Sequence, residues 1–194
     1  MGVREEQKEQ RRMEILNAGL ELFVIKGYME TKISDIAKKV SMSTGLLFHY
    51  FESKEKLYME LVMMGLEGTK YPTQQAYESA IMYFEQFTEQ LFTMMQVQPY
   101  IAKMFVLMAQ AQRSEGTPKE IREIALQVDT IERFIPIVEQ GQKEGSIRAG
   151  DARTLSVAFW CSIQGIAELY AMQPDMTLPE PEWIVDIVRG ERKL

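Results

Sequence analysis

The sequence is poor in the side chains from which metal sites and nucleophilic catalytic sites are built. Among its 194 residues it has one cysteine, Cys161, and one histidine, His49. A single cysteine excludes an internal disulfide framework, and no Cys/His cluster has metal-ligand spacing. The sequence also has no glycine-rich phosphate loop. We therefore predict no catalytic residues, no metal and no cofactor.

Long apolar runs are missing as well. No stretch of about 18 consecutive apolar residues occurs, and the N-terminal sequence MGVREEQKEQRRM is charged where a signal peptide would be apolar. The lone cysteine agrees with a reducing compartment. We expect a soluble, cytoplasmic protein with no membrane partner.

Strand patterns are absent: apolar residues recur at helical spacing along almost the whole chain, without alternating runs or Asn-Gly hairpin signals. Thr31, Ser43 and Ser53 stand where helix N-caps are expected, and Gly27 where a C-cap is expected. This pattern predicts an all-α fold. The expected helices, about nine, cover residues 5–26, 32–40, 44–50, 54–69, 74–97, 100–113, 119–144, 152–172 and 182–189.

The charge is unevenly distributed. The net charge of −6 argues against a nucleic-acid partner when the chain is taken whole. However, residues 1–54 carry nine basic and eight acidic side chains, and the remainder carries 13 basic and 20 acidic ones. The pattern indicates a near-neutral head on an acidic body.

Two short helices separated by a four-residue break, 32–40 and 44–50, have the dimensions of a helix-turn-helix. The second helix must be held on one side while its other side enters the major groove of DNA. Leu47 and Phe51, four residues apart, form the expected held face, and for Phe51 a core role is the favoured interpretation. The residues left to face or flank the groove are Thr44, Gly45, Leu46, Phe48, His49 and Tyr50.

The residues of this region also resemble a known family. The segment RRMEILNAGLELFVIKGYMETKISDIAKKVSMSTGLLFHYFESKEKLY, a quarter of the chain, is similar to the N-terminal domain of TetR-type transcriptional regulators. The resemblance implies a helix-turn-helix DNA-binding domain in residues 1–53 and an effector-binding and dimerisation domain in residues 54–194. The DNA-binding residues that it implies are Thr31, Lys32, Ser34, Ser43, Thr44, Gly45, Leu46, Phe48, His49, Tyr50 and Lys54.

Three positions depart from the family pattern. Ser41 stands where a turn glycine is usual, so we expect a strained or altered turn at a cost of order 1 kcal/mol. Leu46 and Phe48 replace the threonine and tyrosine that are common in the family. Since apolar side chains can touch thymine methyls, we expect thymines under Leu46 in the operator.

The helix expected at 152–172 is apolar around nearly its whole circumference, which indicates burial on more than one side. Its small residues would let a second helix approach closely, so we expect a two-fold dimer seam there. The predicted dimer-interface residues are Leu155, Ala158, Ser162, Gly165, Leu169, Trp183, Ile184 and Ile187.

Fourteen methionines, together with phenylalanines, indicate an interior that can repack around a ligand, although ordinary core is the alternative for each position. The predicted effector-pocket residues are Met64, Phe84, Phe87, Phe105, Met108, Phe134, Trp160 and Gln164.

These features together predict a homodimeric, ligand-responsive transcriptional regulator, most simply a repressor. Its expected partners are a palindromic double-stranded DNA operator, a second copy of the chain and a small, largely apolar effector of unknown identity. The alternative is a DNA-associated structural or assembly protein without an effector. An enzyme is the third and least supported class, because no catalytic constellation is present.

Overall fold

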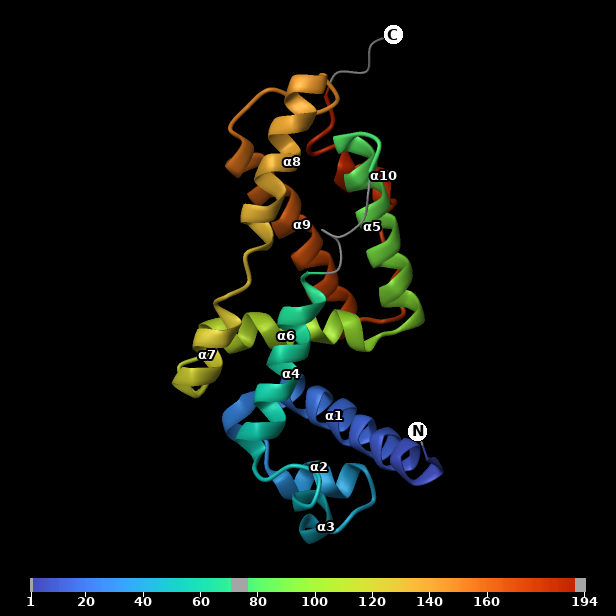
Figure 1. Cartoon of the computed structure of the whole chain (residues 1–194), viewed down its shortest axis with the longest axis vertical. Coiled ribbons are helices and arrows are strands. Elements are labelled where there is room, and N and C mark those ends of the chain that lie inside the picture. The colour runs from blue at the N-terminus through green and yellow to red at the C-terminus, as the bar shows by residue number, and fades with distance from the viewer. Residues whose placement is uncertain (1, 71–76, 191–194) are drawn as a thin grey trace. The chain divides into compact units, whose positions relative to one another are not determined.

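The computed structural model describes residues 2–70 and 77–190, whose regular secondary structure is helical apart from an isolated bridge between Ile147 and Arg189. This confirms the predicted all-α class. The described residues form ten helices, which are labelled in Figure 1. They are α1 (Val3–Glu30), α2 (Ile33–Lys39), α3 (Thr44–Phe48), α4 (Lys54–Gly68), α5 (Ala80–Val97), α6 (Tyr100–Arg113), α7 (Lys119–Ala125), α8 (Thr130–Glu144), α9 (Ala152–Met172) and α10 (Pro181–Val185).

The helices form two compact units. The first unit contains residues 1–67 and 103–127, and the second contains residues 68–102 and 128–194. Packing alone defines these units. The division after residue 53, which separates a DNA-binding head from the rest, stays a prediction about function.

The first unit is built on the close approach of α1 and α4. At Gly19 an added Cβ would lie 2.7 Å from Leu57 Cδ2, so a larger residue would push the two helices apart. Phe23 of α1 meets Tyr58 of α4 edge to face, with ring centroids 4.8 Å apart, and both rings are buried. Ile36 of α2 is fully buried in the same unit. This core supports α2 and α3.

The end of α1 is held by side chains from outside the helix. Gly27 has φ of 78°, which a glycine adopts without a Cβ penalty, and it breaks the regular helix near the predicted end. The predicted N-cap role of Thr31 is wrong, because Lys32 is the N-cap of α2. The Thr31 hydroxyl instead donates to the carbonyls of Gly27, at 2.8 Å, and Leu22, at 3.2 Å. It satisfies carbonyls that the end of α1 leaves free.

The second unit is a bundle in which α8 packs on α9 and α5, while α10 packs on α5 and α9 (Figure 1). Its centre is aromatic. The ring of Phe159 on α9 lies 4.8 Å from Phe84 on α5 and 5.5 Å from Phe134 on α8, centroid to centroid. All three side chains are buried, so these rings join the three helices.

Two predicted helices have different bounds. The expected helix 119–144 is two helices, because the chain leaves helical geometry after Ala125 and starts α8 at Thr130. Gln112 stabilises the break, since its Nε2 donates to the carbonyl of Ala125 at 2.9 Å. The helix expected from residue 74 begins at Ala80, where the Ser79 hydroxyl accepts from Met82 N. Residues 74–76 lie outside the described residues.

Candidate nucleic-acid interface and faces of the body

The turn between α2 and α3 has the altered geometry that the sequence predicts. Ser41 has φ of 53°, the left-handed region that costs an L-residue roughly 1 kcal/mol or more. Two hydrogen bonds close the turn: Ser41 N donates to Lys38 O at 3.1 Å, and Met42 N donates to Ala37 O at 2.8 Å. The strained residue thus takes the place of the usual glycine and redirects the chain into α3.

Helix α3 is held on the predicted face. Leu47 is fully buried, and Phe51 is buried with the Arg12 guanidinium 4.9 Å from its ring centroid. The Ser43 hydroxyl accepts from Leu46 N at 3.2 Å, which confirms its role as N-cap. Because these contacts fix one side of the short helix, its other side is presented outward.

Most of the residues predicted to contact DNA are exposed, on α3 itself, beside its ends or at the start of α2. Leu46 and Phe48 expose 46% and 47% of their surface, a large fraction for apolar side chains. Tyr50 is half-buried. The other exposed residues of the predicted set are Lys32, Ser34, Ser43, Thr44, Gly45 and His49.

Two of the residues predicted to contact DNA make hydrogen bonds within the first unit. Thr31 is 1% exposed and its hydroxyl is engaged with the end of α1. The Lys54 ammonium donates to the carbonyls of Tyr28, at 2.7 Å, and Thr31, at 3.0 Å, and lies 4.2 Å from the centroid of the Tyr28 ring. Burial lowers the pKa of Lys54. The Thr31 side chain is therefore not accessible to DNA, and Lys54 contacts the end of α1, a contact that the family motif does not reveal.

Ion pairs link α1 to α2 and to α6. Glu21 of α1 pairs with Lys39 of α2 at 2.8 Å and with Lys103 of α6 at 2.9 Å. These contacts, with that to Lys39 the stronger, lower the pKa of the Glu21 carboxyl. Lys26 and Asp35 form a second link between α1 and α2, at 2.9 Å. The charges of Lys39 and Lys26 therefore help to hold α1 and α2 together, in addition to any attraction to phosphate.

The predicted dimer residues lie mostly on an exposed face of α9. Ala158, Gly165 and Leu169 are exposed, and an alanine Cβ at Gly165 would meet no atom within 4 Å. Leu155 and Ser162 are half-buried beside them. The same face also carries Val157, Cys161 and Met172, which the prediction missed although their spacing continues the stripe.

The last helix contributes less to this face than expected. Trp183 is 65% exposed, whereas Ile187 is half-buried. Ile184 is buried and belongs to the core of the second unit, so its assignment to a dimer interface is wrong. A five-residue helix offers one outward turn, and here Trp183 occupies it.

The predicted effector residues fall into two sets. Met64, Phe105 and Met108 belong to the first unit. The second unit brings together Phe84, Phe87, Phe134 and Trp160; the rings of Phe87 and Trp160 lie 5.5 and 6.1 Å from that of Phe134. Gln164, one turn after Trp160 on α9, donates to Glu168 Oε1 at 2.9 Å.

Tyr83 is a member of the aromatic cluster that the sequence did not single out. Its ring stacks 6.2 Å from that of Phe87, and burial raises the pKa of its phenol. The hydroxyl is buried and has no hydrogen-bond partner within the described residues. A buried polar group without a partner is unusual, so Tyr83 is a candidate anchor for a ligand.

Neither a metal site nor a clear membrane span is found in the described part of the chain. It contains no group of three or more His, Cys, Asp or Glu residues that could hold a metal ion. By length and composition alone α9 could cross a membrane. However, the core helices of soluble proteins pass the same test, and α9 buries Phe159, Ile163 and Ala167 inside the second unit.

Known proteins resemble this chain most clearly in its N-terminal region. Residues 15–61 match the family described as bacterial regulatory proteins, tetR family. The transcriptional regulator HbdR of Aromatoleum sp. (strain CIB) is 31% identical over 77 residues, which are 34% of each chain. The chain thus spans about a third of that relative's length. The repressor KstR2 of Mycolicibacterium smegmatis is 24% identical over 73% of this chain and 70% of its own.

Solved structures share the fold over nearly the whole chain. The MbdR regulator of Azoarcus sp. CIB has a TM-score of 0.77 at 19% identity and covers 93% of this chain and 98% of its own. KstR2 of Mycobacterium tuberculosis has a TM-score of 0.75 at 19% identity, with 93% and 96% covered. At such identities the likeness shows the fold alone, and the family match is limited to residues 15–61. In those residues the chain matches the tetR family of bacterial regulatory proteins.

Proposed function

We propose that this chain is a homodimeric transcriptional repressor that binds a palindromic operator through α3 and is released by a small, largely apolar effector. One observation carries the proposal. Within the segment that matches the family, α3 buries Leu47 and holds Leu46 and Phe48 outward, half exposed. Exposed apolar side chains on a short, rigidly held helix suit a partner that covers them, as the major groove does.

Base recognition would rest on apolar contact more than is usual in the family. Leu46 and Phe48 have no hydroxyl, so each would read a base edge through the C5-methyl group of thymine. Thr44 on the same helix and His49 directly after it are both exposed and would add polar contacts. Selection of binding sites from random DNA should therefore recover thymine under Leu46, and the Leu46→Thr variant should lose that preference. No base preference at this position in the wild type would contradict the assignment.

Dimerisation is required because two recognition helices must lie about one DNA turn, roughly 34–36 Å, apart to read two half-sites. The exposed face of α9 with Ala158, Gly165 and Leu169 suits this role. Its small residues allow helix axes to come close, and its apolar residues gain from removal of water. We propose that the same face of a second copy packs on it about a two-fold axis.

The proposed effector site is the aromatic cluster of the second unit. Its rings, among them Phe84, Phe87 and Phe134, would surround an apolar ligand, and the Tyr83 hydroxyl would bind the ligand's polar group. The ring centroids are 5.5 to 5.6 Å apart between Phe134 and its neighbours Phe84 and Phe87, so the rings must part to admit a ligand. The ligand can shift the protein between two states only by its differential affinity for them.

The direct packing of these rings is also the observation that favours the second candidate function, a DNA-associated structural protein without an effector. The two functions differ in one experiment. Apolar aromatic and aliphatic compounds are added to the complex of the protein with its own upstream DNA in a mobility-shift assay. Release of DNA by any of them supports the regulator, whereas an unchanged complex with the whole panel supports the structural protein.

The same assay tests the polar anchor and the DNA contact separately. With a compound that releases DNA, Tyr83→Phe should raise the concentration needed by about threefold to tenfold, because one hydrogen bond is lost. The matched control is Tyr77→Phe, since the Tyr77 hydroxyl already meets Gln140 Oε1 at 3.4 Å. Without effector, binding must weaken steeply as salt rises, since phosphate contacts release counterions. Salt-insensitive or absent binding would count against operator recognition.

A further inference from the structure

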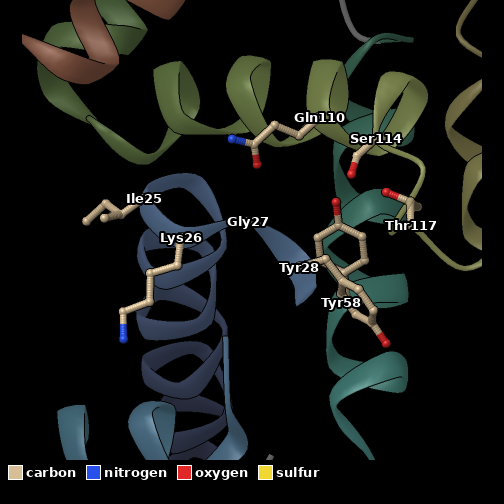
Figure 2. A pocket seen from close by; sticks show the side chains of 8 residues that line it. All are labelled: Ile25, Lys26, Gly27, Tyr28, Tyr58, Gln110, Ser114 and Thr117. Atoms are coloured by element: carbon tan, nitrogen blue, oxygen red, sulfur yellow. The ribbon is translucent and has the colours of Figure 1, made fainter. Parts of the chain in front are cut away.

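A pocket of about 310 Å³ lies within the first unit, and none of its lining residues belongs to α2 or α3. Figure 2 shows its walls: Tyr28 at the end of α1, Tyr58 on α4, Gln110 on α6, and Ser114 and Thr117 after α6. This volume is at the lower end of the range for small-molecule sites, about 300–1,000 Å³. The pocket therefore has room for one small molecule.

Two polar atoms in the wall lack a partner. Thr117 is 4% exposed, and its Oγ1 makes no hydrogen bond with any described residue. Gln110 Nε2 donates to the carbonyl of Val24 at 3.1 Å, which fixes the amide, but its buried Oε1 also accepts no hydrogen bond within the described residues. Buried polar atoms are almost always paired, so two orphans in one small pocket indicate a missing partner.

The charges around the pocket favour a neutral occupant. The lining residues include no carboxylate. Lys26, at the rim, is paired with Asp35 at 2.9 Å. The phenol of Tyr58 stays neutral, because burial raises its pKa to about 12. The nearby Thr117 hydroxyl lowers this pKa by a smaller amount. The contact between the two hydroxyls does not reach hydrogen-bond geometry. No unpaired charge on the lining would attract an ion.

We propose that this pocket binds a small neutral molecule that carries an N–H or O–H donor, of the chemical class of primary amides and phenols. The donor bonds to Gln110 Oε1, and an acceptor on the same molecule accepts a hydrogen bond from the Thr117 hydroxyl. The rings of Tyr28 and Tyr58, with centroids 4.8 Å apart, provide the apolar part of the wall. The site is separate from the proposed effector cluster and does not depend on DNA binding.

Occupation of the pocket would stabilise the support of the recognition helix. Its walls come from α1, α4 and α6, and α4 begins six residues after the end of α3. A molecule bonded to Gln110 and Thr117 and packed on Tyr58 ties these helices together. The free energy by which it stabilises the folded first unit grows with the logarithm of one plus the ratio of its concentration to its dissociation constant.

Benzamide and phenol are suitable probes, and toluene is the control that keeps the ring and removes the donor. Amide signals of Tyr28, Tyr58 and Thr117 are followed in two-dimensional ¹H–¹⁵N spectra of the full chain, up to about 10 mM probe, the range expected for weak fragments. We expect saturable shifts with benzamide or phenol and none with toluene. Absence of saturable shifts with both probes overturns the proposal, as do equal shifts with toluene.

The Thr117→Val variant tests the proposed hydrogen bond. Because it removes an unpartnered hydroxyl, the melting temperature of the unliganded variant should stay unchanged or rise, while its affinity for the bound probe falls about threefold to tenfold. The control is Thr88→Val, since the equally buried Thr88 hydroxyl donates to Phe84 O at 2.8 Å; its melting temperature should fall and its probe affinity should not change. An unchanged probe affinity in Thr117→Val overturns the proposal whatever the melting temperature does.

Discussion

Replacing Lys54 by alanine should destabilise the first unit rather than only weaken DNA binding. The Lys54 ammonium lies 2.7 Å from the carbonyl oxygen of Tyr28 and 3.0 Å from that of Thr31, and 4.2 Å from the centroid of the Tyr28 ring. The truncation removes these contacts and leaves the carbonyls at the end of α1 without this donor.

The size of the effect follows from these contacts. A hydrogen bond to a charged group contributes about 1.5–3 kcal/mol, and a cation over an aromatic ring adds about 0.5–1 kcal/mol at a partly exposed site. Burial of the ammonium, which lowers its pKa, offsets part of this gain. We therefore expect a net loss of about 2 kcal/mol in the free energy of unfolding.

Urea unfolding measures this loss. With a slope of about 2 kcal/mol per molar urea, the midpoint should fall by about 1 M. The control is Lys32→Ala, because Lys32 is exposed at the start of α2. Lys32→Ala should change stability by less than about 0.5 kcal/mol, and should lower the salt dependence of DNA binding by about one phosphate contact.

The opposite pattern would refute this reasoning. If Lys54→Ala leaves the urea midpoint unchanged and lowers the salt slope of DNA binding, Lys54 is a phosphate contact, as the family motif alone implies. The bonds to Tyr28 and Thr31 would then contribute nothing measurable.

Three further predictions concern the core, the dimer and the dependence on pH. Phe134→Ala should lower the free energy of unfolding by about 3–5 kcal/mol in urea titrations, because Phe134 is 1% exposed among packed rings. Gly165→Arg should leave the fold intact, since nothing lies within 4 Å of its Cβ position, but sedimentation should show monomers in place of dimers. The pKa of the Glu21 carboxyl is lowered, chiefly by Lys39. The carboxylate therefore contributes stability above about pH 4.5, and this contribution is lost as the pH falls through the lowered pKa. In urea titrations at stepped pH, Glu21→Gln should lack this acid-sensitive part of the stability.

The helical class, the turn at Ser41 and the two faces of α3 were predictable because local patterns determine them. The spacing of Leu47 and Phe51 marks a held face, and Ser43 has the chemistry of an N-cap. The unusual backbone of Ser41 followed from a missing glycine. Each of these features depends on residues close together in the sequence.

Features that depend on distant residues were missed. The role of Lys54 depends on carbonyls 23 and 26 residues earlier in the chain, which a short motif does not reveal. The break after Ala125 is supported by Gln112 of another helix. Ile184 and Trp183 are neighbours with opposite environments, and only the packing of α10 distinguishes them. Helical periodicity gives such faces, but not which face a neighbouring helix covers.

The most direct test of the account is equilibrium binding of α3 variants to the protein's own upstream DNA, followed by fluorescence anisotropy at one fixed salt concentration. Leu46→Ala and Phe48→Ala remove the half-exposed apolar side chains of α3, and Ile25→Ala removes an apolar side chain of the same unit that is 78% exposed. The account predicts a loss of about tenfold or more for each α3 variant, the value of one specific base contact, and less than about twofold for Ile25→Ala. Equal affinities for all three variants and the wild type would contradict the claim that α3 reads the operator.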